Sequence, residues 1–275
     1  MLAEMSPTRR VLLVGGLVLA LVVVVVLTVG LLRRGPAGPP DRREQLPPVV
    51  LVPGYGGATT GLDVLGAALR SDGRFVRVVD LGTASLGDLH DQADLVKAAV
   101  QDVLRSTGSG SVDVVAFSAG GIAVRLWATD GGGASVARRI ITLSTPHHGT
   151  ERSAIPKVPG PTPCPTACRQ LVAGSAVLQS LDQGDETPAG PDWVSIWSDT
   201  DEVVVPPTSA KLDGALSFSV QSVCPDVTIS HQGMTSNRIV VAMVRREIGS
   251  AAPVLPDSSV CRPVTKPSAT PTARD

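Results

Sequence analysis

Short runs of aliphatic and β-branched residues recur along this chain, and segments with helical spacing separate them. The runs predict buried strands at 49–52, 75–81, 112–117, 139–143 and 193–197. Apolar residues spaced three or four apart predict helices at 61–69, 86–104 and 120–127 between these strands. Alternating strands and helices are typical of an α/β fold with a mostly parallel, doubly wound sheet.

The pattern is less regular after the strand at 139–143. Residues 145–189 are rich in Pro, Gly, Ser and Thr, which predicts an irregular excursion with one short helix near 168–180. Strands are predicted again at 216–223 and 227–229, followed by a last helix at 235–248. In such a sheet, ligands bind at the carboxyl ends of the strands.

The N-terminal region has a different hydrophobic pattern. Residues 11–32 carry no charge, and as a helix they would measure about 33 Å, enough to cross a bilayer. A cleavable signal peptide has a shorter apolar region of about 7 to 15 residues. We therefore expect a transmembrane anchor rather than a cleaved signal, although a secreted protein remains the alternative.

The hydrophobic pattern and local composition divide the chain into five parts. We expect a cytoplasmic N-terminus at 1–10, the anchor at 11–32, a Pro/Gly-rich linker at 33–48, one folded domain at 49–249 and a Pro/Thr-rich tail at 250–275.

The cysteines bear on the cellular compartment. The chain has four, Cys164, Cys168, Cys224 and Cys261. An even number beside an export-type segment favours two disulfides in an oxidising compartment, with four unpaired thiols as the alternative. If bridged, Cys164 and Cys168 close a small loop, and Cys224 and Cys261 attach the tail. We therefore expect a single-pass membrane protein with its domain outside the cytoplasm.

Charge limits the class of partner. The formal net charge is −1 and charged residues make up 18% of the chain, so no long-range field would attract nucleic acid. We expect a monomer that binds a small-molecule or lipid substrate and contacts the membrane through 11–32.

Ser118 lies where the predicted strand at 112–117 meets the next helix. A serine on such a turn has a strained backbone, and only small residues two positions either side avoid a clash. Ala116 and Gly120 meet that demand. This context predicts a nucleophile elbow, with the Ala119 N–H facing a developing oxyanion.

The first strand runs into the Gly-rich turn 53–57, which has the sequence Pro-Gly-Tyr-Gly-Gly. This is where a second oxyanion donor is needed, and the N–H of Tyr55 is the best placed. A phosphate-binding loop is excluded because no Gly-Lys-Ser/Thr follows.

A serine nucleophile needs a base and an acid to orient it. The four histidines are His90, His147, His148 and His231, and only His231 follows both Ser118 and a loop that can supply the acid. That loop carries Asp199, Asp201 and Glu202. Asp201 is the preferred acid, and Asp199 is the second choice.

These motifs together resemble the α/β-hydrolase lipases, in particular small bacterial lipases and esterases with Ala two residues before the nucleophile. The resemblance is carried by VLVPGYGG, VDVVAFSAGG, ITLSTPHHGT, VSIWSDTDEVVVP and ISHQG, in the expected order. It implies Ser118, Asp201 and His231 as catalytic residues, and Tyr55 and Ala119 as oxyanion donors. Pro53 replaces the His of many members, and the CPTAC loop is additional.

The implied activity is hydrolysis of carboxylic esters, with lipid-like esters favoured and no cofactor or metal required. An envelope-lipid acyltransferase or a thioesterase could use the same triad. A catalytically inactive hydrolase fold that binds a lipid or a protein is a further alternative.

Overall fold

A six-stranded parallel sheet forms the centre of the folded domain in the computed structural model, which describes residues 46–157, 163–249 and 251–262 and a few positions between 20 and 28. The strands are β1 Val49–Val52, β2 Val76–Val78, β3 Val112–Phe117, β4 Ala137–Leu143, β5 Asp192–Trp197 and β6 Leu216–Ser219. Their order is β2-β1-β3-β4-β5-β6, and every neighbouring pair is parallel. The predicted parallel α/β architecture is confirmed.

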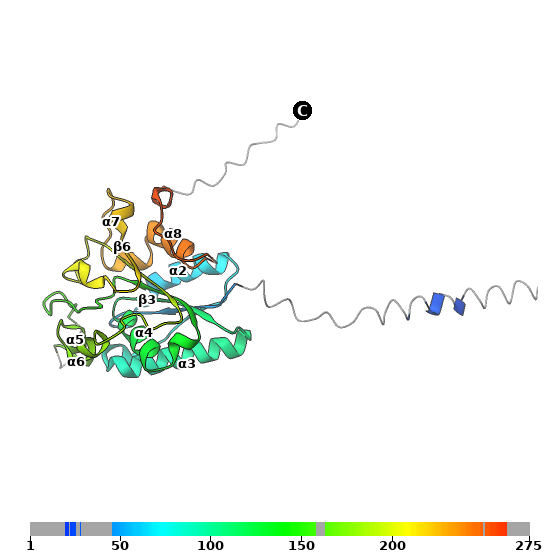
Figure 1. Ribbon diagram of the computed structural model, residues 1–275, viewed down its shortest axis with the longest axis horizontal. Coiled ribbons are helices and arrows are strands. Elements are labelled where there is room, and N and C mark those ends of the chain that lie inside the picture. The colour runs from blue at the N-terminus through cyan, green and yellow to red at the C-terminus, as the bar shows by residue number, and fades with distance from the viewer. Residues whose placement is uncertain are drawn as a thin grey trace, which may run out of the picture. The chain divides into compact units, whose positions relative to one another are not determined.

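Helices cover both faces of this sheet. Figure 1 shows α3 (Leu89–Thr107) and α4 (Ala119–Thr129) on one side, and α2 (Thr60–Ser71) and α8 (Arg238–Glu247) on the other. Successive strand side chains point to opposite faces, so β1 contributes to two separate cores. Val50 and Val52 belong to the core under α3 and α4, while Val49 and Leu51 belong to the core under α2 and α8. The sheet is therefore buried on both sides, as its continuous apolar runs predict.

Local signals set the bounds of α3. The Asp88 side chain accepts the His90 N–H at 2.9 Å and caps the first turn. Gly108, at φ 66°, ends the helix in the left-handed conformation. The helix predicted at 86–104 therefore lies three residues further along the chain.

The excursion after β4 contains two short helices rather than the single helix predicted at 168–180. These are α5 (Thr166–Leu171) and α6 (Ala176–Leu181). Gly174 lies between them at φ 78°, and the Ser175 side chain accepts the Leu178 N–H to begin α6. A left-handed residue breaks the helical hydrogen-bond pattern, so the prediction was wrong there.

Several other predicted strands and the last predicted helix were also too long. The strand predicted at 216–223 ends at Ser219, whose hydroxyl accepts the Ser222 N–H at 3.1 Å and begins α7 (Val220–Val223). The predicted strand at 227–229 is not a strand, because Ile229 bonds to the Thr200 side chain instead of a neighbouring strand. The strand predicted at 75–81 is shorter in the structure, where it comprises only β2. The last helix, predicted from residue 235, begins at Arg238 as α8. The side chain of Asn237 caps it by accepting the Ile239 N–H.

Short 3₁₀ helices connect these elements. They are η1 Gly82–Leu86, η2 Gly133–Ser135, η3 Pro207–Ala210, η4 Gln232–Thr235 and η5 Ser258–Cys261.

The chain divides into two units, residues 1–45 and residues 46–275. Within the residues that the structure describes, no helix is both long and apolar enough to cross a bilayer. Most of the predicted anchor at 11–32, the linker up to residue 45 and the tail beyond residue 262 lie outside the described residues.

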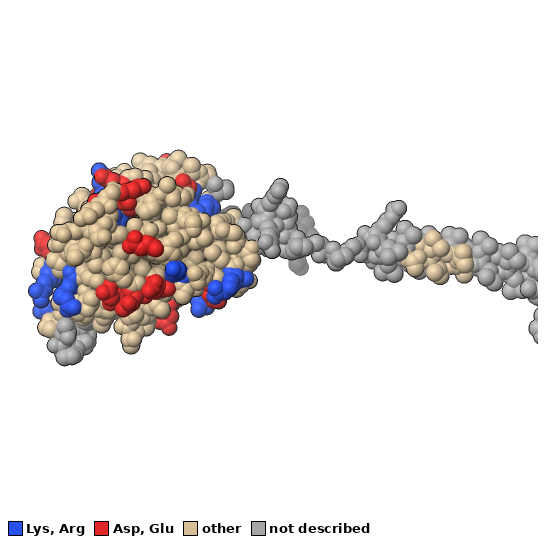
Figure 2. All heavy atoms as spheres, turned by 60° about the horizontal axis from the view of Figure 1, so that its bottom comes forward, with Lys and Arg blue, Asp and Glu red and all other residues tan. Residues whose placement is uncertain are grey.

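Charged side chains form small groups on one face of the domain. Figure 2 shows acidic and basic side chains in separate patches among mainly uncharged residues on the face drawn. This distribution agrees with the net charge of −1 and with the absence of a dominant field predicted from it.

Candidate active site

Ser118 lies on the sharp turn between β3 and α4. Its backbone has φ 54° and ψ −128°, a conformation that non-glycine residues rarely adopt. The turn is held between tightly packed neighbours, since a Cβ atom on Gly54 would lie 2.9 Å from that of Ser118. A Cβ atom on Gly120 would collide with the carbonyl oxygen of Pro53. Of the two small residues predicted around Ser118, Gly120 therefore has the predicted steric role.

The hydroxyl of Ser118 faces a histidine from a distant part of the chain. Its Oγ lies 2.9 Å from Nε2 of His231, and both residues are buried. His231 begins the turn that leads into η4, which lies after the last strand. The tilted ring of Phe117 packs against the imidazole with a centroid distance of 4.8 Å.

The other ring nitrogen of His231 faces Asp201. Nδ1 lies 2.8 Å from Oδ2 and 3.0 Å from Oδ1 of this carboxylate. Oδ1 also accepts the N–H groups of Val203 and Val204, each at 2.9 Å. Burial acts to raise the pKa of Asp201, but the hydrogen bond and charge of His231 and the two backbone N–H groups lower it overall.

The ionised state of Asp201 determines the histidine tautomer. An ionised carboxylate only accepts hydrogen bonds, so the proton of neutral His231 lies on Nδ1. Nε2 then carries the lone pair and accepts the Ser118 O–H. This arrangement can remove a proton from the serine when it attacks an electrophile.

The alternative acid, Asp199, is directed elsewhere. Its Oδ1 accepts the indole N–H of Trp197 at 3.0 Å, and its Oδ2 accepts the hydroxyl of Ser219 at 2.8 Å. Glu202 accepts the backbone N–H of His231 at 3.0 Å but does not bond its ring. Among the three carboxylates of this loop, the structure brings only Asp201 to the imidazole.

A set of polar side chains clamps the histidine segment to the aspartate loop. The hydroxyls of Ser198 and Thr200 donate to the Ile229 carbonyl at 2.7 and 3.0 Å. Gln221 donates to Ser198 Oγ and to the Val227 carbonyl, both at 3.1 Å. We did not identify these positioning residues from the sequence, because Ser, Thr and Gln in loops carry no distinctive pattern. The only available signal was that Ser198 and Thr200 lie just before the preferred acid, Asp201, in the sequence.

The two predicted oxyanion donors are the residue after Ser118 and the residue after Gly54, which packs against Ser118. Ala119 is the first residue of α4, so its N–H has no partner within the helix. Tyr55 follows Gly54, the residue whose Cα is packed against Ser118. Within the described residues neither backbone N–H is used by another protein group. The Tyr55 phenol is half-buried, and this burial raises its pKa.

The remaining histidines are engaged elsewhere. His90 is exposed and pairs with Asp88. His147 is fully buried beside Thr142, and burial, reinforced by the charge of Arg125, places its pKa well below the ordinary value. His148 contacts Ser209 and Glu186. Of the four histidines, only His231 contacts Ser118.

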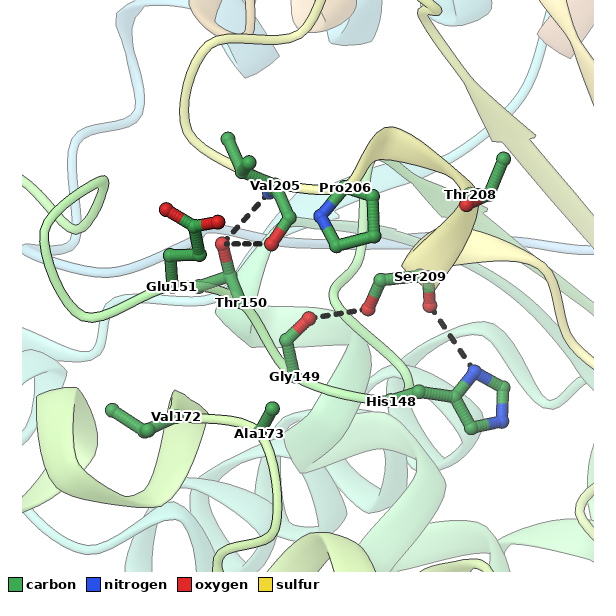
Figure 3. A pocket seen from close by; sticks show the side chains of 10 residues that line it. All are labelled: His148, Gly149, Thr150, Glu151, Val172, Ala173, Val205, Pro206, Thr208 and Ser209. Atoms are coloured by element: carbon green, nitrogen blue, oxygen red, sulfur yellow. Dashed lines mark hydrogen bonds between the residues drawn. The ribbon is translucent and has the colours of Figure 1, made fainter.

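A cavity of about 470 Å³ lies next to the aspartate loop. Figure 3 shows residues 149–151 running between Val172 and Ala173 on one side and Val205 and Pro206 on the other. Thr150 supports this wall, because its hydroxyl donates to the Val203 carbonyl at 2.7 Å and accepts the Val205 N–H at 2.8 Å. The cavity wall at Val205 is therefore next in the chain to Val203 and Val204, whose N–H groups hold Asp201.

Both predicted disulfides are present. Cys164 pairs with Cys168 inside the excursion, and Cys224 pairs with Cys261. The second bridge attaches the segment 251–262 to Cys224, the residue that follows α7, so part of the predicted tail belongs to the folded domain. The alternative of four unpaired thiols was wrong.

Comparison with known proteins identifies the fold. No protein-family model and no curated protein sequence matches the chain. Among solved structures, Aspergillus fumigatus lipase B superposes with a TM-score of 0.65 and 23% identity, over 76% of this chain and 54% of that one. The chain thus spans about half the length of that lipase.

Two further structures cover nearly the whole of the matched protein. Bacillus licheniformis lipase BlEst2 in its mature form has a TM-score of 0.62 and 19% identity, over 78% of this chain and 96% of that one. A structure of the metagenome-derived lipolytic enzymes LipS and LipT has a TM-score of 0.54 and 16% identity, over 74% and 94%. At these identities the similarity is one of fold, and the chain has the α/β-hydrolase fold of lipases and esterases.

Proposed function

We propose that this protein is a serine hydrolase that cleaves carboxylic esters through an acyl-enzyme. The observation that carries the proposal is the continuous chain of contacts from Ser118 through His231 to Asp201, with distances of 2.9 and 2.8 Å. Its members come from three separate loops at the carboxyl ends of the strands. A serine in a strained conformation beside two free N–H groups supports the same reaction.

The proposed reaction begins with attack of Ser118 Oγ on the ester carbonyl carbon. His231 Nε2 takes the hydroxyl proton, and the Asp201 carboxylate stabilises the imidazolium that forms. The N–H groups of Tyr55 and Ala119 hold the negative oxygen of the tetrahedral intermediate. His231 then returns the proton to the leaving alcohol. Water, activated by the same imidazole, hydrolyses the acyl-enzyme and regenerates Ser118.

The apolar cavity beside the aspartate loop supports an ester with an apolar acyl group. Its lining combines the apolar side chains of Val172, Ala173, Val205 and Pro206, which suit an apolar acyl group, with polar residues such as Thr150 and Ser209. Similar folds occur in proteins described as lipases. We therefore propose a lipid-like ester as the substrate class.

We also propose that residues 11–32 anchor the protein in a membrane, with the hydrolase domain outside the cytoplasm as a monomer. The two disulfides support this placement, because such bonds persist in oxidising compartments. The proximity of the domain to a membrane would supply lipid-like substrates.

Labelling with a fluorophosphonate, which reacts with activated serines, tests the catalytic proposal. The wild-type protein is expected to form one adduct at Ser118, located by peptide mass spectrometry, and Ser118→Ala is expected to form none. Ser144→Ala is the matched control, because Ser144 is also buried and also has positive φ, at 44°. An adduct that persists in Ser118→Ala, or no adduct in folded wild-type protein, would refute the proposal.

A further inference from the structure

A second cavity, of about 450 Å³, adjoins the one beside the aspartate loop, and we call it the arginine cavity. The described residues that line it are Arg152, Pro163, Cys164, Arg169 and Val172. Val172 lines both cavities, and Figure 3 shows it at the end of the first cavity that lies away from the His148 ring. A ligand that fills the first cavity past Val172 can therefore extend into the arginine cavity.

Arg169 is oriented by the turn that carries it. Its two terminal nitrogens donate to the Cys164 carbonyl at 2.8 Å and to the Thr166 hydroxyl at 3.0 Å. The disulfide between Cys164 and Cys168 closes this turn, and α5 begins inside it. A guanidinium has five N–H groups, so three are left for other acceptors. Because both bonds lie within one short cross-linked segment, the guanidinium is held in place before a ligand binds.

The two arginines carry charge that no carboxylate balances within the described part of the chain. Neither Arg152 nor Arg169 forms an ion pair there, whereas the buried Arg125 and Arg139 each pair with an aspartate. Even if Glu151 of the neighbouring cavity is counted, one positive charge remains. A hollow lined by charges of one sign concentrates the opposite ion. Guanidinium groups bind carboxylate and phosphate oxygens through paired hydrogen bonds.

We propose that the arginine cavity binds an anionic group at the far end of the substrate's acyl chain. This inference rests on the proposed ester hydrolysis and narrows its substrate class to esters whose apolar acyl chain ends in a carboxylate or a phosphate. The apolar part lies along Val172 and Ala173, and the anionic end meets Arg152 and Arg169. A wholly apolar acyl chain leaves both guanidinium groups without this partner.

Two series of p-nitrophenyl esters test the proposal with the full-length protein. One series runs from the butanoate to the decanoate, and the other contains the half-esters of succinate to sebacate, which match it carbon for carbon. At the best chain length, the wild-type protein is expected to favour the anionic ester by about fivefold in kcat/KM. Added salt should reduce this preference.

Arg152→Gln and Arg169→Gln are each expected to reduce the preference by about threefold, with kcat/KM for the neutral esters nearly unchanged. Arg77→Gln is the matched control, because Arg77 is also exposed and lines neither cavity. It should keep the wild-type preference. Equal kcat/KM for the two series at every length would overturn the proposal, and so would an undiminished preference in both folded cavity variants.

Ligand binding by Ser118→Ala separates this proposal from the proposed hydrolysis, because binding needs no turnover. Calorimetric titration is expected to give a Kd about fivefold lower for monomethyl suberate than for methyl octanoate. Equal affinities would overturn the anion site and leave ester hydrolysis standing. If the wild-type protein hydrolysed no ester but the difference in Kd persisted, hydrolysis alone would be overturned.

Discussion

The carboxylate of Asp201 is buried and lies 2.8 Å from Nδ1 of His231, whereas Asp199, two residues earlier in the same loop, is exposed and bonds Trp197 and Ser219. The difference matters because only a group that contacts the imidazole can orient it and stabilise its charge. The pair therefore provides an internal control for the proposed mechanism.

We expect Asp201→Asn to lower kcat by about 10³ to 10⁴-fold, because an amide cannot hold the imidazole in the same tautomer or stabilise its charge. Asp199→Asn should change kcat less than about tenfold, since the loop keeps its other contacts. Hydrolysis of a p-nitrophenyl ester by the two purified variants measures both effects. If Asp199→Asn lost more kcat than Asp201→Asn, the assignment of Asp201 as the catalytic acid would be wrong.

Filling the cavity tests its proposed role in binding the acyl group. Ala173→Phe places a large side chain at the wall of the cavity, so kcat/KM for long-chain esters should fall at least about tenfold relative to acetate esters. Ala67→Phe, on the exposed side of α2, is the control and should leave this ratio unchanged. Parallel losses for short and long chains in Ala173→Phe would argue against an acyl site here.

Removing the charge of a buried carboxylate on α8, that of Glu247, should increase stability in a pH-dependent way. Burial raises the pKa of Glu247, with the Val254 N–H, Arg246 and Arg139 opposing this effect in part. A raised folded-state pKa means that the ionised form destabilises the fold above that pKa, and that this penalty is absent below the ordinary value of 4.5. Glu247→Gln should therefore stabilise the protein near neutral pH by on the order of 1 kcal/mol, or roughly 2 to 4 °C in Tm.

Thermal unfolding of Glu247→Gln from pH 4 to pH 8 measures this effect. The gain should shrink as the pH falls through the folded-state pKa of Glu247. Exposed Glu151→Gln is the control and should show little change at any pH. If Glu247→Gln changed the Tm by the same amount at every pH, or lowered it, the charge of Glu247 would not be the cause.

The two disulfides should contribute unequally to stability, because they close loops of different length. Cys224 and Cys261 are 37 positions apart, and Cys164 and Cys168 are 4 apart. The loop-entropy relation predicts about 4 kcal/mol for the longer loop and about 2 kcal/mol for the shorter one. Chemical denaturation of two double variants, Cys224→Ser with Cys261→Ser and Cys164→Ser with Cys168→Ser, measures which disulfide contributes more to the free energy of unfolding. Equal losses would indicate that loop closure does not dominate.

The sequence determined those features that depend on neighbouring residues. The apolar runs defined β1 and β3 within one residue, because a strand buried on both faces needs continuous aliphatic side chains. The small residues around Ser118 and the Gly-rich turn at 53–57 are likewise local requirements of a tight strand-to-helix turn. Chain order then reduced the choice of histidine to His231.

Only the tertiary structure decided between groups that are equivalent in the sequence. Asp199 and Asp201 share one loop, and their roles differ because Val203 and Val204 donate to one while Trp197 and Ser219 donate to the other. The break at Gly174 and the end of β6 at Ser219 depend on backbone conformation and caps that outweigh apolar periodicity.

The contacts of Ser198 with Ile229 and with Gln221, and of His148 with Glu186, join residues more than twenty positions apart. No local pattern encodes such pairs, because their distance is set by how the sheet brings its loops together at one edge.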